Sequence, residues 1–282
     1  MKLIKERWPE RLKKIKPEVK SLYYKGEIDL LLDDSPKLAI VGSRRMTEYG
    51  ERVIEKWMPA LVERGVIIVS GFMYGVDQTA HQACLQNGGK TMAVLGWGIE
   101  WAVGPSDVDL YQRIVDSDSL IVSEYEGKTV PQLWLFPQRN RLVAGIADAV
   151  LVVEGSAKSG SLITAKLASR FGKKLLAVPG QVTNRLAEGT NGLIREGVAT
   201  AVTKAEEVLN EMGLLPGQLK FPSTEAELEL DNPLVSLLAD GERSVDEISR
   251  LLKMEVSQVL GKLTELSLSG MVSESEGKYR LM

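Results

Sequence analysis

The sequence predicts an α/β protein, with a largely parallel sheet covered by helices on both faces and a small C-terminal domain. Between residues 37 and 213, short apolar runs alternate with amphipathic stretches, the pattern of parallel strands joined by helical crossovers. The apolar runs are almost continuous, as expected of strands buried on both faces of a sheet. The expected strands are Leu38 to Val41, Val66 to Ser70, Thr91 to Leu95, Leu120 to Ser123, Ala149 to Val153 and Lys174 to Val178.

Helical periodicity fills most of the intervals between these strands. The expected helices include Tyr49 to Glu63, Val76 to Asn87 and Leu162 to Phe171. Strands and helices that alternate in this order are typical of an extended Rossmann-like domain, which we assign to residues 37–213.

Residues 1–36 precede this domain as a short basic segment. The first 20 residues hold eight Lys or Arg against three Glu, and Trp8, Leu12 and Ile15 stand at helical spacing. A helix here could pack on the main domain or reach out to nucleic acid, and the sequence leaves both alternatives open.

The C-terminal part of the chain is predicted to be a linker followed by a winged-helix domain. Residues 214–232 are rich in proline and acidic residues, which is typical of a linker. Residues 233–282 then show three helical stretches and a strand pair around Gly277. The stretches are Pro233 to Leu238, Ser244 to Leu252 and Ser257 to Ser269, and the strands are Val272 to Ser273 and Tyr279 to Leu281.

Composition excludes several classes of protein. The chain has 282 residues and a net charge of −3, so a nucleic-acid partner would have to be held by a local patch. The one cysteine, Cys84, and the one histidine, His81, exclude a disulfide framework and a multi-histidine metal site. Charged residues interrupt every apolar run that could form a signal peptide or membrane span, so we expect a cytoplasmic protein.

Polar residues follow the first two predicted strands, at the edge of an open α/β sheet where ligands bind. Gly42, Ser43, Arg44 and Arg45 come directly after the first strand, and Gly71 follows the second. Glycine permits a close backbone approach, serine offers a hydroxyl, and arginine offers a planar fork that suits phosphate. A tight turn with solvated arginines is the alternative interpretation.

A serine-rich loop follows the strand that ends at Val153. Ser159, Gly160 and Ser161 stand where the next helix begins, and free amides together with the helix dipole favour an anion there. Lys158 adds a positive charge and Thr164 adds a hydroxyl one turn later. The loop therefore resembles a phosphate-binding loop.

A second group of cations opens the helix before that strand. Pro137 can begin a helix, and the residues behind it are Arg139, Asn140 and Arg141. Cations in a first helical turn oppose the helix dipole, which indicates an anionic ligand. Trp134 and Phe136 could stack on bases, although packing in the core is the favoured role for both.

No catalytic residue, metal or nucleotide cofactor is predicted. Asp77 and His81 are four residues apart, but a structural hydrogen-bonded pair is favoured over a catalytic dyad because no nucleophile accompanies them. Ser161 stands where a Walker A motif requires lysine, and Trp101 stands where a dinucleotide-binding fingerprint beginning at Gly96 requires glycine.

Taken together, these segments resemble the DNA-processing protein A family, also called DprA or Smf. The similarity covers residues 37–212, with a winged-helix tail over 233–282. The matching segments are Val41 to Arg44, Ser70 to Asp77, Ala80-His81, Phe136 to Arg141, Ser159 to Ala165, Ala177 to Gly180 and Gly189 to Asn191.

The resemblance implies a protein that binds single-stranded DNA, dimerises and loads a RecA-type recombinase during natural transformation. Ser43, Arg44, Lys158, Ser159, Gly160, Ser161 and Thr164 would form the phosphate pocket, Arg139 and Arg141 would extend it, and Asn140 would order the loop. This chain departs from the family in its short N-terminal segment and in its bulky Phe72-Met73-Tyr74 sequence. The winged helix holds eight acidic and six basic residues, which favours a protein-contact or regulatory role over duplex binding.

Two other functions compete with this interpretation. A nucleotide-hydrolysing enzyme similar to the lysine-decarboxylase-like phosphoribohydrolases would need a P-G-G-x-G-T-x-x-E string. The segment Pro179 to Thr183 lacks its second glycine, and no glutamate follows at the required position. A transcription regulator that reads duplex DNA is disfavoured by the acidic winged helix.

Overall fold

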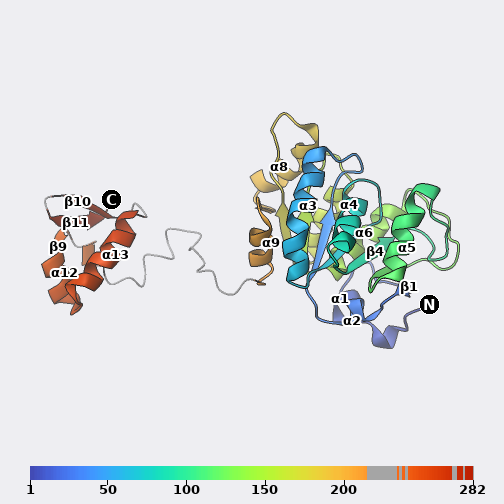
Figure 1. Cartoon of the computed structure of the whole chain (residues 1–282), viewed down its shortest axis with the longest axis horizontal. Coiled ribbons are helices and arrows are strands. Elements are labelled where there is room, and N and C mark those ends of the chain that lie inside the picture. The colour runs from blue at the N-terminus through green and yellow to red at the C-terminus, as the bar shows by residue number, and fades with distance from the viewer. Residues whose placement is uncertain (215–233, 235–236, 239–240, 269–271, 276, 282) are drawn as a thin grey trace. The chain divides into compact units, whose positions relative to one another are not determined.

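The structure is a computed structural model that describes residues 1–214, 234, 237–238, 241–268, 272–275 and 277–281. The chain divides into two compact units, Met1–Pro216 and Gly217–Met282, both drawn in Figure 1. Apart from Leu214, the predicted linker lies outside the described residues.

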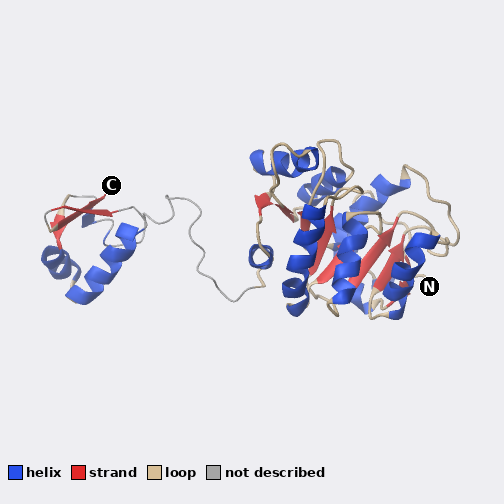
Figure 2. Ribbon diagram, turned by 45° about the horizontal axis from the view of Figure 1, so that its top comes forward, coloured by secondary structure: helices blue, strands red, loops and turns tan. Residues whose placement is uncertain are grey.

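The first unit is built on an eight-stranded sheet with the order β1-β5-β4-β3-β2-β6-β7-β8. Only the edge strand β1 runs antiparallel to its neighbour, and the other pairs are parallel. Figure 2 shows the sheet between blue helices. The strands are β1 Tyr23–Gly26, β2 Lys37–Val41, β3 Ile67–Ser70, β4 Thr91–Leu95, β5 Leu120–Ser123, β6 Ala149–Val152, β7 Lys174–Ala177 and β8 Thr200–Ala201.

The predicted fold class is confirmed, and the six expected strands appear within one residue of their expected ends. Strands β1 and β8 were not predicted. Both lie at the edges of the sheet, and β8 has only two residues, both exposed, so neither shows a continuous apolar run.

Helices cover both faces of the sheet, and alternate residues of each strand point to opposite layers. Leu38 and Ile40 of β2 join the layer under α3 and α4, whereas Ala39 and Val41 join the layer under α6 and α7. The helices of this unit are α1 Glu10–Lys13, α2 Asp29–Leu32, α3 Glu48–Glu63, α4 Val76–Gln86, α5 Val108–Asp116, α6 Leu135–Ile146, α7 Ser161–Arg170, α8 Glu188–Arg195 and α9 Ala205–Glu211.

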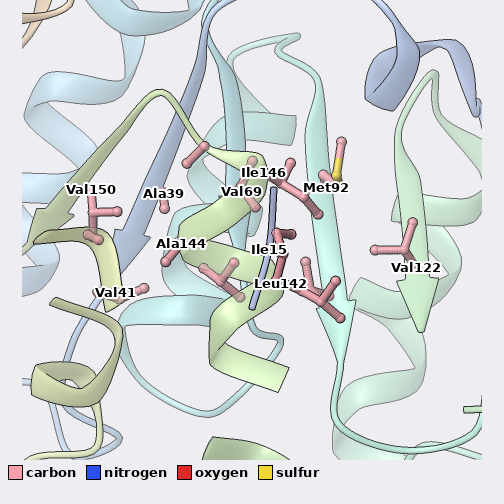
Figure 3. Close-up of a cluster of buried hydrophobic side chains, with 14 of the residues drawn as sticks. Ile15, Ala39, Val41, Val69, Met92, Val122, Leu142, Ala144, Ile146 and Val150 are labelled. Atoms are coloured by element: carbon pink, nitrogen blue, oxygen red, sulfur yellow. The ribbon is translucent and has the colours of Figure 1, made fainter. Parts of the chain in front are cut away.

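The N-terminal segment is part of this unit's core. Its helices α1 and α2 are short, and Trp8, Leu12 and Ile15 are all buried. Ile15 packs against α6 beside Leu142, as Figure 3 shows. A Cβ at Gly145 would lie 2.3 Å from a side-chain carbon of Ile15, so the glycine allows this close approach. Of the two alternatives for this segment, packing on the main domain is the one observed.

The second unit has a three-stranded sheet with the order β10-β11-β9. Ser244 caps α12 through a reciprocal capping box with Glu247, and Ile248 packs with Val259 of α13 in the core. The elements are β9 Arg243–Ser244, α12 Val245–Leu252, α13 Val256–Leu268, β10 Val272–Ser275 and β11 Lys278–Leu281. Of the predicted first helix, Leu234, Leu237 and Leu238 are described and helical, while Pro233 lies outside the described residues, as does Ser269 at the predicted end of the third helix.

Candidate nucleic-acid interface

A pocket of about 350 Å³ opens beyond the carboxyl ends of β2, β3 and β6. The chain runs outward from β2 through β3, β4 and β5, and then returns to place β6 on the other side of β2. Ligands in open α/β sheets bind at such a reversal, because the loops on either side diverge and leave a crevice. We call this cavity the switch-point pocket. The predicted site residues that line it are Gly42, Arg44, Gly71, Arg139, Asn140, Ser159, Gly160, Ser161 and Thr164.

The loop after β2 places one arginine in the pocket and one outside it. Ser43 is buried, and its hydroxyl accepts a hydrogen bond of 3.0 Å from the Arg45 amide, which shapes the turn. Arg44 is exposed and lines the pocket, with its guanidinium carbon 5.3 Å from the centre of the Phe136 ring. Arg45 is also exposed but does not line the pocket. Ser43 therefore supports the loop, and Arg44 is the cation that it presents.

Arg139 is buried in the floor of the pocket. Its guanidinium donates hydrogen bonds to the backbone oxygens of Gly71 and Val94, which joins the ends of β3 and β4. Burial lowers the pKa of Arg139 to about 10, so the side chain stays charged at neutral pH. A Cβ at Gly71 would lie 2.5 Å from guanidinium nitrogens of Arg139 and from a carboxylate oxygen of Asp77. Only glycine fits between these two charged groups.

Asp77 is a pocket residue that sequence analysis did not include in the site. Its carboxylate accepts a hydrogen bond of 3.3 Å from the Met73 amide, and it lies beside the Arg139 guanidinium. Burial raises the pKa of Asp77, while the charge of Arg139 opposes that rise. The sequence indicates a pairing with His81, four residues on, because Arg139 is distant in sequence from Asp77.

The expected pair between Asp77 and His81 is not formed. His81 is fully buried, and its Nδ1 lies 2.6 Å from the Thr91 hydroxyl oxygen. The Thr91 hydroxyl also donates a hydrogen bond of 2.9 Å to the Ile68 backbone oxygen. Burial lowers the pKa of His81 to about 3, which keeps the ring neutral. His81 therefore lies on the buried face of α4 and is part of the core.

The helix that carries Arg139 begins earlier than expected. Helix α6 starts at Leu135, two residues before Pro137, so Arg139 and Arg141 lie beyond its first turn. Proline is tolerated in the first turn because the amides there need no partner within the helix. The dipole of α6 therefore does not indicate an anionic ligand at these arginines, and the prediction that they lie in the first turn is wrong.

Arg141 does not reach the switch-point pocket. Residues two positions apart on a helix point in different directions, so Arg141 faces away from Arg139. Its guanidinium is buried and donates to both carboxylate oxygens of Glu124, at 2.7 and 2.8 Å. Glu124 also accepts a hydrogen bond of 3.0 Å from the backbone of Lys20. The ion pair thus fastens the N-terminal segment to α6, and we remove Arg141 from the proposed site.

Asn140 connects α6 to the serine-rich loop. Its amide nitrogen donates to the Gly160 backbone oxygen at 3.4 Å, and its side-chain oxygen accepts from Nε of Arg139 at 3.3 Å. In the loop, the hydroxyls of Ser159 and Ser161 are 2.8 Å apart at the start of α7. Lys158 is exposed and does not line the pocket.

The two aromatic residues before Pro137 have different positions. Core packing is the role that the sequence favours for Trp134, but 61% of the residue's surface is exposed. Phe136 is half-buried, forms part of the pocket wall and packs edge-on against Trp97 at 6.1 Å between ring centres. Sequence alone could not separate these two roles, because they depend on where α6 begins.

The comparisons with known proteins agree with this architecture. Residues 1–213 match the family described as DNA recombination-mediator protein A, and residues 220–278 match the DprA winged helix domain. The chain belongs to the DNA recombination-mediator protein A family. It is 42% identical to the DNA processing protein DprA of Streptococcus pneumoniae over 190 residues, which cover 67% of this chain and 66% of that protein.

Two solved structures of family members are similar to this chain. DNA processing protein A of Streptococcus pneumoniae has a TM-score of 0.70 and 39% identity, over 75% of this chain and 73% of that one. The Helicobacter pylori protein has a TM-score of 0.67 and 31% identity, over 74% of this chain and 94% of that one, and its structure concerns a single-stranded DNA binding mode. No helix in the described part of this chain is long and apolar enough to cross a membrane.

The buried ion pair gives a stability prediction. Replacing Glu124 with alanine leaves the Arg141 charge buried without its partner, which should lower the free energy of unfolding by about 3–5 kcal/mol. The control is Glu126→Ala, at an exposed position in the same loop, which should cost less than about 0.5 kcal/mol. Urea denaturation of both variants measures the difference. Equal midpoints would show that the pair does not fasten the N-terminal segment.

Proposed function

We propose that this protein binds single-stranded DNA by holding backbone phosphate in the switch-point pocket. The observation that carries the proposal is the composition of that pocket, which brings Arg44 and the N-terminus of α7 to one cavity. Amides at a helix start favour an anion, and an exposed arginine can pair with phosphate in a planar fork. The single-stranded DNA binding of the Helicobacter pylori relative supports the same ligand for this chain.

The cellular role that fits this ligand is recombination mediation. We infer that the protein acts in the cytoplasm as a homodimer, protects single-stranded DNA and loads a RecA-type recombinase onto it during DNA uptake. Membership of the DNA recombination-mediator protein A family supports this role. The acidic winged-helix domain has little attraction for phosphate, so we assign it a protein-contact or regulatory function.

The proposed site comprises residues with different tasks. Arg44 and the loop that begins α7 contact phosphate. Thr164 contributes a hydroxyl at the pocket wall. Lys158 and Arg45 lie next to these residues in the sequence and add positive charge. Arg139, Asn140, Gly71 and Ser43 hold the loops in place. Gly42 has no room for a side chain, because a Cβ there would lie 2.5 Å from Val76.

Replacing Arg44 with alanine tests the cation of the pocket. Loss of a charge-assisted contact should weaken binding to an oligo-dT strand by about 10-fold or more. It should also make the slope of log affinity against log salt shallower by roughly 0.7. Fluorescence anisotropy across a salt series measures both quantities.

The matched control for Arg44→Ala is Arg7→Ala, at an exposed arginine that does not line the pocket. It should change the affinity by less than about 2-fold. Equal losses for the two variants would mean that DNA lies on a diffuse surface and that the pocket assignment is wrong.

Gly160 is a position where a substitution should change ligand binding without changing the stability of the fold. A Cβ at Gly160 would meet no atom within 4 Å beyond its chain neighbours and the adjoining helical backbone, and the residue has a right-handed helical conformation. Gly160→Val should therefore leave thermal stability nearly unchanged but obstruct the approach of phosphate to the start of α7. Gly192, in α8, has equally open surroundings, so Gly192→Val is the control. Oligo-dT affinity that falls equally in both variants would remove the start of α7 from the binding site.

A further inference from the structure

Glu154 is a buried carboxylate that follows β6 and takes no part in the proposed phosphate contacts. Only 2% of its surface is exposed, and it does not line the switch-point pocket. It nevertheless lies close to that pocket, because a Cβ at the pocket residue Gly42 would be 2.8 Å from the Glu154 backbone oxygen. A buried negative charge is costly, and near an anion site it also repels the ligand. Its contacts therefore indicate a compensating role.

The Glu154 side chain reaches from the end of β6 to the start of α3. One carboxylate oxygen accepts a hydrogen bond of 2.8 Å from the Thr47 amide, and the other accepts one of 2.6 Å from the Thr47 hydroxyl. A Cβ at Gly50, in the first turn of α3, would lie 2.8 Å from the carboxylate, so the glycine makes room for it. The negative charge thus lies at the N-terminus of α3, where the helix dipole favours it.

Thr47 depends on this long-range contact. It is the residue before α3, and its side chain makes no capping hydrogen bond to that helix. Its hydroxyl donates to Glu154 instead, 107 positions later in the chain. The contact therefore anchors the end of the loop that joins β2 to α3.

Arg44 lies in this loop, between two anchors. On one side the Ser43 backbone oxygen accepts a hydrogen bond of 3.2 Å from the Val76 amide. On the other side Thr47 is bound to Glu154. Arg44 itself is exposed, so the position of its guanidinium depends on the backbone of the loop rather than on burial of the side chain.

The backbone next to Glu154 is fixed at the start of the serine-rich loop. The Gly155 amide donates to the Leu186 backbone oxygen at 2.6 Å, and the Gly155 oxygen accepts from the Gly189 amide at 2.8 Å. The carboxylate therefore extends from a held segment of one phosphate loop to the end of the other.

We propose that Glu154 is a positioning residue, which sets the place of the Arg44 guanidinium relative to the serine-rich loop. The proposal rests on the proposed DNA-binding function. By holding the two loops at one spacing, Glu154 lets a single phosphate meet Arg44 and the start of α7 together. A positioning role strengthens phosphate binding, whereas the negative charge alone would weaken it, so the two effects have opposite signs.

The test is a double-mutant cycle between Glu154 and Arg44 in the full-length protein, with oligo-dT affinity as the readout. Glu154→Gln replaces one acceptor oxygen by a donor nitrogen, so the side chain can no longer accept both hydrogen bonds from Thr47. It should weaken binding by about 3-fold to 10-fold. In an Arg44→Ala background the same change should alter the affinity by less than about 2-fold, because the guanidinium that Glu154 positions is absent. Fluorescence anisotropy measures all four proteins.

Two further variants separate positioning from charge and from loss of the fold. Asp148→Asn also removes one negative charge, at the opposite end of β6, where Asp148 accepts a hydrogen bond of 2.9 Å from the Lys37 amide. It should change the affinity by less than about 2-fold. Thr47→Val removes only the hydroxyl donor and leaves the Glu154 charge in place, so it replaces Glu154→Gln in the cycle if that variant does not fold. It should weaken binding by about 2-fold or more.

The sign of the Glu154→Gln effect decides between the two roles. Binding that is unchanged or tighter would overturn the positioning role and leave the phosphate pocket intact. Equal losses with and without Arg44 would overturn it as well, because Glu154 would then act independently of that arginine. A wild type that does not bind oligo-dT, or an Arg44→Ala protein with wild-type affinity, would refute the proposed function and the positioning role with it.

Discussion

The buried guanidinium of Arg139 ties together the strand ends on which the candidate site is built. It bridges the carbonyls that end β3 and β4, lies beside Asp77 and leaves room only for glycine at position 71. A buried charge is costly unless surrounding groups compensate it. Here two backbone oxygens accept hydrogen bonds from the guanidinium, and the negative charge of Asp77 lies nearby. These contacts hold the floor of the pocket in place. They also fix the positions of the loops that surround it.

This constraint also explains how neighbouring arginines take different roles. Arg139 and Arg141 belong to one short sequence string, yet the turn of α6 sends the first under the pocket and the second to Glu124. Arg44, by contrast, is exposed, so among the described residues it is the arginine of the pocket that can approach a ligand freely. Exposure at the pocket and structural support are thus divided between residues that look alike in the sequence.

The sequence predicted the central strands closely, because continuous runs such as those at Ile67–Ser70 and Ala149–Val152 leave few alternatives to burial on both faces. It also predicted the glycine and serine loops, since these follow strand ends. It missed edge strand β1, where half of the residues are polar or glycine, and it misjudged Trp134 and Arg141. The last two errors depend on tertiary structure, because the start of α6 decides where Trp134 and Arg141 point.

The central claim is that the switch-point pocket binds phosphate of a single strand, and comparative binding tests it most directly. Affinities for oligo-dT, a duplex of the same length and a nucleoside monophosphate would be measured side by side across salt concentrations. The account predicts the highest affinity for oligo-dT, with a linear loss of log affinity as log salt rises. Tightest binding to the monophosphate, or to the duplex, would contradict it.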